Sequence, residues 1–226
     1  MKNKDGILNL PLIVVGGGGH AKVLISMLLQ QQRRILGIVD VKPLPPLLGI
    51  DYLGDDREVL NYSADQVRLV NGIGSIDSTS LHRTIYEKFT EMEYIFATVL
   101  HPSAVIAPEV QIEDGVQVMA GAVVQPGTRL GANVIVNTGA RVDHDCMIDP
   151  HAHVAPGVTL SGNVHVGKGA HIGTGATIIQ GIKVGSAGIV GAGAVVICDV
   201  PDEVTVVGVP AESLRARTTT EHKAIL

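Results

Sequence analysis

The 226-residue sequence is poor in aromatic side chains, with no tryptophan, two phenylalanines and four tyrosines. Large aromatic residues usually fill much of a globular core, so their scarcity argues against an ordinary core of packed layers. Instead, 46% of the residues are hydrophobic and 27 are glycines. This is the composition that a coil built of valine, isoleucine, alanine and glycine requires.

Other absences narrow the class of protein. The two cysteines, Cys146 and Cys198, do not look like a disulfide pair, which favours a reducing compartment. The net charge of −5 gives no reason to expect nucleic acid or an anionic membrane as a partner. No stretch reaches the roughly 18 uncharged apolar residues of a membrane span, and residues 1–10 lack the apolar run of a signal peptide. We therefore expect a cytoplasmic protein without a membrane span.

From Ile106 to Val196 an aliphatic residue occupies every sixth position without a miss. The series is Ile106, Ile112, Val118, Val124, Leu130, Val136, Val142, Ile148, Val154, Leu160, Val166, Ile172, Ile178, Val184, Val190 and Val196. A small or β-branched residue stands two positions before each member, as Ala104 does before Ile106 and Cys146 before Ile148. A six-residue period does not fit a long amphipathic helix, and it favours short strands separated by tight corners. Three hexapeptides would close one triangular coil, so the series predicts about five coils.

Residues 1–98 follow a different pattern. An apolar run over 12–15 predicts a strand, a run of four glycines follows, and residues 21–32 have the apolar spacing of a helix. Further strands are expected over 35–39, 67–73 and 94–99, and a second helix over 78–92. This order begins a parallel α/β sheet, but about 90 residues are too few for a complete dinucleotide fold. We therefore expect a Rossmann-like α/β domain over 1–98 and a β-helix with a C-terminal cap over 99–226.

The glycine run ends in His20 and lies between a strand and a helix, where backbone N–H groups can approach phosphates. Asp40 ends the next strand, where its carboxylate could accept hydrogen bonds from a ribose or a base. A tight structural turn is the alternative interpretation. A nicotinamide cofactor is disfavoured because the match to G-x-G-x-x-G is partial. A nucleotide-linked substrate, whose diphosphate would use the same loop, fits better.

Five of the nine histidines fall in the repeat: His144, His151, His153, His165 and His171. Because the aliphatic positions fill the interior, these histidines should point outward or lie at corners. His153 and His171 are 18 residues apart, so one coil would place one above the other. No third ligand has a suitable spacing, and no metal is expected.

His144 is flanked by two acids, Asp143 and Asp145. A carboxylate beside an imidazole fixes its tautomer and raises its basicity, as an amine or hydroxyl attacking a thioester requires. Asn137, one hexapeptide earlier, could hold the acceptor group. A solvated surface loop is the alternative interpretation, and which of the two acids orients His144 stays open.

Together these features resemble the sugar acyltransferase family typified by PglD and NeuD, bacterial enzymes acting on amino-sugar nucleotides or sialic acids. The resemblance covers Leu12 to about Arg217, and it is carried by GGGGH, NTGARVDHDC, SGNVHVGKGAHIGTGATI and GVPA. It implies a left-handed parallel β-helix and a homotrimer with active sites between neighbouring coils. It also implies acetyl-CoA lying along the coils and a nucleotide-sugar bound by the N-terminal domain.

The resemblance further implies roles for individual residues. His144 would be the general base, Asp145 its partner and Asn137 the residue beside the acceptor amine. His153 would contact the thioester region of acetyl-CoA. The pantetheine arm would pass Gly162, Gly173 and Gly191. The nucleotide-sugar would contact Gly17, Gly18, Gly19, His20 and Asp40.

The expected activity is acetyl-CoA-dependent N-acetylation of a nucleotide-linked 4-amino-4,6-dideoxy sugar for bacterial surface glycan synthesis, with a UDP-linked sugar preferred. One alternative is O-acetylation of sialic acid by a NeuD-like enzyme. Another, of a different class, is a non-catalytic trimeric scaffold. A metalloenzyme similar to γ-carbonic anhydrases would share the coil, but it would leave the N-terminal domain without a role.

Overall fold

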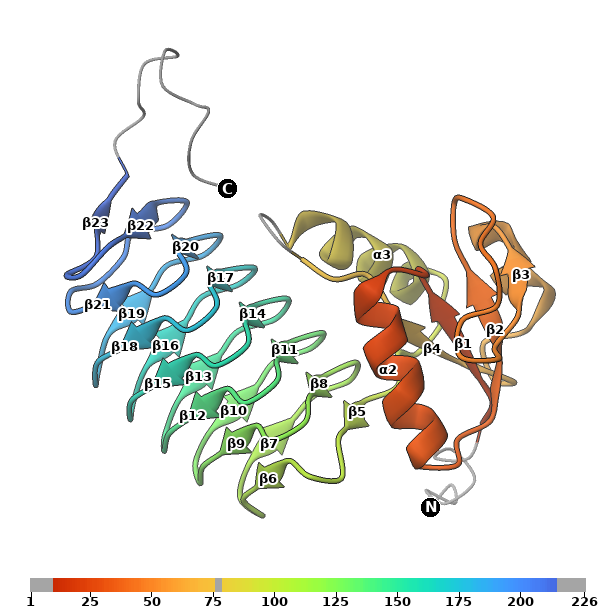
Figure 1. Cartoon of the computed structure of the whole chain (residues 1–226), viewed down its shortest axis with the longest axis horizontal. Helices are drawn as coiled ribbons and strands as arrows, with labels where there is room; N and C mark the ends of the chain where they lie inside the picture. The colour runs from red at the N-terminus through yellow and green to blue at the C-terminus, as the bar shows by residue number, and fades with distance from the viewer. Residues whose placement is uncertain (1–9, 76–78, 215–226) are drawn as a thin grey trace, which may run out of the picture.

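The computed structural model describes residues 10–75 and 79–214 and contains a small α/β domain followed by a long β-helix (Figure 1). The α/β domain has four parallel strands in the order β3-β2-β1-β4. Its elements are β1 (Leu12–Val15), α2 (Gly19–Gln30), β2 (Ile35–Val39), β3 (Tyr52–Gly54), the 3₁₀-helix η1 (Asp56–Asn61), β4 (Arg68–Asn71) and α3 (Ser80–Glu91). The expected Rossmann-like arrangement is confirmed. Neither α-helix in the described ranges is long and apolar enough to cross a membrane.

Strand β1 lies at the centre of this domain, and all four of its side chains are buried. Successive side chains of a strand point to opposite faces of the sheet. Leu12 and Val14 accordingly pack with α2, whereas Ile13 and Val15 pack with α3. The carboxyl ends of β1 and β2 lie side by side, which brings the glycine loop next to Asp40.

The β-helix is built from very short strands in parallel register. Each strand pairs with the strand 18 residues further along, as Arg141 pairs with Thr159 and His153 with His171. The strands are β5 (Val99–Leu100), β6 (Val105–Ile106), β7 (Gln111–Ile112), β8 (Gln117–Val118), β9 (Val123–Val124), β10 (Arg129–Leu130), β11 (Ile135–Val136), β12 (Arg141–Val142), β13 (Met147–Ile148), β14 (His153–Val154), β15 (Thr159–Leu160), β16 (His165–Val166), β17 (His171–Ile172), β18 (Thr177–Ile178), β19 (Lys183–Val184), β20 (Ile189–Val190), β21 (Val195–Val196), β22 (Thr205–Val207) and β23 (Glu212–Ser213). They form sheets of eight (β5 to β23), six (β6 to β21) and five strands (β7 to β19).

From β6 to β21, the second residue of each two-residue strand points into the coil, and the small residue two positions earlier fills the corner. Val142, Ile148, Val154 and Cys146 are all buried in one continuous cluster that runs through the β-helix. The predicted left-handed parallel β-helix is confirmed. Leu100 packs against the same cluster, so the repeat begins one hexapeptide earlier than Ile106.

Some expected elements differ. The strand expected over 94–99 is wrong, because only an isolated bridge from Phe96 to Leu69 joins this segment to the α/β sheet, and Val99 already belongs to the β-helix. The chain leaves the sheet edge here to enter the first coil. Strand β3 was not expected after the proline-rich loop. The second helix begins at Ser80 in the described residues, and Ser78 lies outside them. The domain boundary at residue 98 stays a prediction.

The α/β domain covers the outer face of the eight-stranded sheet. The outward residues of that sheet, 18 positions apart, are buried: Val99, Gln117, Ile135, His153 and His171. Helix α2 packs on the apolar members. The expectation that the repeat histidines are merely outward residues is therefore incomplete, since the adjoining domain removes His151, His153 and His171 from solvent.

A buried polar network joins the two parts. The Asn71 side chain donates hydrogen bonds to the carbonyl of His82 (2.8 Å) and to Asn133 Oδ1 (3.2 Å). Asn133 Nδ2 in turn lies 3.1 Å from His151 Nδ1. Burial lowers the pKa of His82 to about 4, and burial likewise lowers the pKa of His151 to about 4. Both histidines are therefore neutral at pH 7.

These two pKa values predict a loss of stability in acid. Between the ordinary value of 6.5 and about 4, the unfolded chain binds protons that the folded chain does not. The free energy of unfolding should thus be flat above pH 6.5 and fall below it, by at most about 1.4 kcal/mol per pH unit for each histidine. Urea denaturation at pH 7.5, 6 and 5 measures the slope, and His82→Gln should make it shallower. Equal stability at all three pH values would contradict the assignment.

Candidate active site

His144 lies at the corner between β12 and β13, with its side chain 53% exposed. Its Nδ1–H donates to Asp145 Oδ2 at 2.8 Å, while Asp143 Oδ1 accepts from the backbone N–H of His144 at 2.7 Å. The hydrogen bond to Asp145 raises the pKa of His144, and the charges of both acids raise it further. Asp145, rather than Asp143, is thus the acid in contact with the imidazole. The unprotonated Nε2 is left to accept a proton.

Glycines in the coils above and below His144 make room for this pair. Asp145 has a positive φ of 58°, and a Cβ at Gly127, one coil earlier, would collide with its carboxylate. A Cβ at Gly162, one coil later, would lie 2.5 Å from His144 Nε2. The absence of a side chain at Gly162 therefore leaves the space that the imidazole occupies. Its role toward acetyl-CoA stays a prediction.

Cys146 follows this pair but does not join it. Its thiol is buried in the coil and lies 3.3 Å from the carbonyl of Ser161, to which it donates. Burial raises the pKa of the thiol to about 11, so it is protonated at neutral pH and a poor nucleophile.

Asn137 and His153 lie on the side of the eight-stranded sheet, away from the corner that carries His144. Asn137 follows β11 of the eight-stranded sheet, and its Nδ2 donates to His153 Nε2 at 3.0 Å. The other ring nitrogen of His153 forms a hydrogen bond with Ser75 of the α/β domain. Within one chain, the structure therefore brings together two of the predicted site residues but separates them from the base.

The glycine loop has two structural and two open positions. A Cβ at Gly16 would collide with Ile73, and a Cβ at Gly17 would collide with Leu44. A Cβ at Gly18 or Gly19 would meet nothing within 4 Å. Helix α2 starts at Gly19 with no acidic residue in its first turn. The helix itself therefore supplies no acidic side chain that would oppose an anionic ligand at Gly18 and Gly19.

Asp40 and His20 already have partners inside the protein. Asp40 Oδ2 accepts from the N–H of Gly17 at 2.7 Å, and Oδ1 accepts from the N–H of Lys42 at 3.1 Å. His20 Nε2 donates to Gln117 Oε1 at 2.7 Å, on the face of the β-helix, and burial lowers its pKa. Asp40 therefore orders the glycine loop, and His20 helps to dock the two domains. Their predicted contact with a nucleotide-sugar stays a prediction.

Gly173 and Gly191 are required by the stacking of coils. A Cβ at Gly173 would lie 2.6 Å from the backbone nitrogen of Ala192, and a Cβ at Gly191 would lie 2.7 Å from Val207 Cγ1. Their predicted contact with the pantetheine arm stays a prediction, because the packing alone accounts for glycine at both positions.

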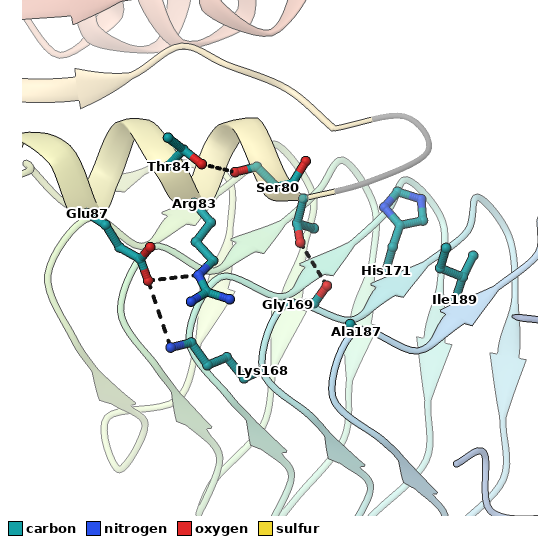
Figure 2. Close-up of a pocket in the computed structure, with 10 residues that line it drawn as sticks. Ser80, Arg83, Thr84, Glu87, Lys168, Gly169, His171, Ala187 and Ile189 are labelled. Carbon is teal, nitrogen blue, oxygen red and sulfur yellow. Dashed lines mark hydrogen bonds and ion pairs between the residues drawn. The ribbon is translucent and has the colours of Figure 1, made fainter. Parts of the chain in front are cut away.

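A groove of about 360 Å³ runs between α3 and the later coils. Figure 2 shows Arg83 and Lys168 turned toward Glu87, to which they form ion pairs of 2.7 and 3.9 Å. His171 lines the other end of the groove, and its ring meets that of His153 edge to face at 5.0 Å between centroids. The predicted placement of one histidine above the other is confirmed by the pairing of His153 with His171. Within the described ranges, no three potential metal-ligating side chains gather into one group.

Several residues of this region were missed in the sequence: Asn71, Ser75, His82, Gln117 and Asn133. Gln117 carried a usable signal, because it shares an 18-residue column of outward positions with Val99 and Ile135. Apolar residues on an outward column indicate a covered face. The others lie outside the columns that the repeat defines or at its corners, where no periodicity marks them.

The His144–Asp145 contact predicts a titration. Asp145→Asn removes the charge that stabilises the imidazolium, so the pKa of His144 should fall toward its ordinary value. Asp143→Asn, which removes a charge but leaves the ring contact, should lower that pKa less. NMR titration of the His144 ring in both variants measures the difference, and a larger fall in Asp143→Asn would reverse the assignment.

The substitution Gly162→Ala should displace the imidazole of His144 without loss of the fold. The added methyl group occupies the space of His144 Nε2, while the backbone at this position needs no positive φ. Acetyl transfer should fall at least about tenfold, and the circular dichroism spectrum should not change. Ser161→Ala, at the adjoining position, serves as the control. Full activity in Gly162→Ala would show that the ring position seen here is not the working one.

Two family models match the chain. One, described as the PglD N-terminal domain, matches residues 11–89, and the other, described as bacterial transferase hexapeptide (six repeats), matches residues 109–144. A search of curated protein sequences found no match.

Solved structures match nearly the whole chain. Perosamine N-acetyltransferase from Caulobacter crescentus, a histidine variant in complex with CoA and GDP-perosamine, is 37% identical with a TM-score of 0.86, covering 91% of this chain and 97% of that one. The acetyltransferase domain of PglB from Neisseria gonorrhoeae, in complex with acetyl coenzyme A, is 37% identical with a TM-score of 0.83, covering 91% and 100%. WeeI from Acinetobacter baumannii is 27% identical with a TM-score of 0.81, covering 91% and 100%.

The identity of 37% extends over at least 97% of the first two relatives, and the two family models fall on the two structural parts of the chain. The chain therefore belongs to the PglD/NeuD family of sugar acyltransferases, and it is a hexapeptide-repeat acetyltransferase.

Proposed function

We propose that this enzyme transfers the acetyl group of acetyl-CoA to the amine of a nucleotide-linked 4-amino-4,6-dideoxy sugar, for the synthesis of a bacterial surface glycan. The observation that carries the proposal is the His144–Asp145 pair. Its imidazole is exposed, its Nδ1–H is held at 2.8 Å by a carboxylate and its pKa is raised. An outward Nε2 lone pair of this kind is what a general base for an amine requires.

The reaction follows from this geometry. An acceptor amine that has lost its ammonium proton to solvent attacks the thioester carbonyl carbon while His144 Nε2 takes a second proton from the nitrogen. The C–S bond then breaks, and the sulfur of coenzyme A leaves with the proton that His144 returns. Asp145 stabilises the imidazolium between these two events. Cys146 takes no part, because its thiol is buried and protonated.

The glycine loop supports a nucleotide-linked acceptor. The open positions Gly18 and Gly19 at the start of α2 suit a diphosphate, with Asp40 ordering the loop behind them. The Caulobacter relative is in complex with GDP-perosamine. The sequence favours a UDP-linked sugar, so the test includes both a UDP-linked and a GDP-linked acceptor.

A homotrimer with its active sites between chains is part of the proposal. His144 lies at the corner between the six-stranded and five-stranded sheets, whereas the glycine loop and His153 lie on the side of the eight-stranded sheet. The outward residues of the six-stranded sheet are Val105, Val123, Arg141, Thr159, Thr177 and Val195. This face is largely uncharged and β-branched, so it suits contact with a second copy. A neighbouring chain would then bring its own acceptor site to His144.

The experiment measures release of coenzyme A from acetyl-CoA with UDP- and GDP-linked 4-amino-4,6-dideoxy sugars and with free sialic acid. We expect turnover with a nucleotide-linked amine, and His144→Ala should reduce it by about 10²–10⁴-fold without changing the oligomeric state. His165→Ala is the matched control. His165 Nε2 also contacts a carboxylate, Asp149, at 2.8 Å, but His165 lies within strand β16 rather than at the corner that carries His144.

The outcomes separate the alternatives. Full turnover in His144→Ala, or an equal loss in His165→Ala, would refute the base assignment. Turnover with sialic acid alone would indicate the O-acetylating branch. Absence of turnover with all three acceptors would favour a scaffold.

A further inference from the structure

The segment after β4 connects the glycine loop to the β-helix. A Cβ at Gly16 would collide with the Ile73 side chain, and a Cβ at Gly74 would lie 3.1 Å from the Cβ of His20. On its other side, the segment carries the half-buried Ser75, whose hydroxyl forms a hydrogen bond with His153 Nδ1. One short segment thus contacts both the proposed nucleotide site and the histidine implied at the thioester.

This segment is held in place by the protein interior. His82 Nδ1 lies 2.7 Å from the carbonyl oxygen of Ile73, and the N–H of Ile73 donates to Asn71 Oδ1 at 3.3 Å. His82 and Asn71 are both buried. The position of Ser75 is therefore set by the same network that docks the α/β domain on the coil.

The hydrogen bonds around His153 define its tautomer. Asn137 Oδ1 accepts from the N–H of Thr138 at 2.7 Å, which orients the Asn137 amide. Its Nδ2 consequently faces His153 Nε2 at 3.0 Å, and Nε2 must act as the acceptor. A neutral imidazole has one N–H, so the proton lies on Nδ1 and is donated to the oxygen of Ser75. Burial, the largest cause, lowers the pKa of His153 well below 6.5 and keeps the ring neutral.

We propose that Ser75 is a positioning residue for acetyl transfer: its hydroxyl oxygen holds His153 in the Nδ1–H tautomer, and His153 Nε2 thereby orients the Asn137 amide. The expected effect on turnover rests on the proposed function. The tautomer of His153 does not depend on it. In this arrangement His153 is not a donor at Nε2. The second N–H of the Asn137 amide is the donor that this corner offers to a substrate oxygen.

The loss of the hydroxyl has a definite expected effect. Without Ser75 Oγ, a proton on Nδ1 of the buried ring loses its side-chain acceptor and keeps only the Ser75 main chain as a partner, so the tautomer equilibrium moves toward Nε2–H. Nε2–H and Asn137 Nδ2 then face each other as two donors, and the amide turns away. Turnover should fall about tenfold, with KM for the nucleotide-sugar nearly unchanged, because the effect lies on the orientation of one hydrogen-bond donor.

The test combines NMR and kinetics on the full-length protein. In ¹⁵N-histidine-labelled enzyme at pH 7.5, the His153 ring should show the Nδ1–H tautomer in the wild type and the Nε2–H tautomer in Ser75→Ala. Ser75→Thr, which keeps the hydroxyl, should restore both the tautomer and kcat. Ser103→Ala is the matched control, since the exposed Ser103 carries an Oγ that lies 2.8 Å from the Nδ1 of His101, and its loss should leave kcat unchanged.

Each result bears on the inference. A wild-type ring protonated on Nε2, or a tautomer that is the same in Ser75→Ala, would overturn it. A shifted tautomer with unchanged kcat would overturn the role in turnover. If the wild type shows the expected tautomer but acetylates none of the tested sugars, the proposed function fails while the structural part of the inference is upheld.

Discussion

The parallel register of 18 residues is the constraint on which the whole molecule depends. Each residue of the coil is placed directly above the residue 18 positions earlier, as His171 is above His153. This fills the interior with valine, isoleucine and alanine without aromatic side chains. It also decides which corner residues meet: Gly127 lies under Asp145 and Gly162 lies over His144. The orientation of His144 and Asp145 therefore depends on glycine at positions 127 and 162, where a side chain would collide with them, as well as on the contact between the two residues.

Histidine has two different roles in this protein, an exposed base and a buried neutral hydrogen-bonding group, because its surroundings differ. His144, exposed between two acids, has a raised pKa and suits proton transfer near neutral pH. His82 of α3 and the coil residues His151 and His153 are buried where the α/β domain meets the β-helix, and burial lowers their pKa values. As neutral rings, these three supply one donor and one acceptor each, which matches a buried amide network better than a cation would.

The sequence predicted the β-helix well because its period is local and repeats through the whole coil. It also predicted the pairing of His153 with His171, since both lie on one 18-residue column. It did not predict the contacts made between the two domains. Ser75 reaches His153, and His20 reaches Gln117, across 78 and 97 residues, and no pattern within either domain indicates how the two surfaces meet. The strand expected over 94–99 was wrong for the same reason, because entry into the first coil overrides local β-propensity.

The register has a consequence for variation in chain length. The α/β domain is anchored along the coil from Val99 to His171, and His144 lies within that stretch. The distance along the coil axis between His144 and the α/β domain is therefore a whole number of coils, each about 4.8 Å high. A coil gained or lost beyond Val196 leaves the separation of base and glycine loop untouched. One gained between Val118 and Val136 would move His144 a full step away from the first coils. Proteins of this design can thus grow or shorten freely at the carboxyl end only.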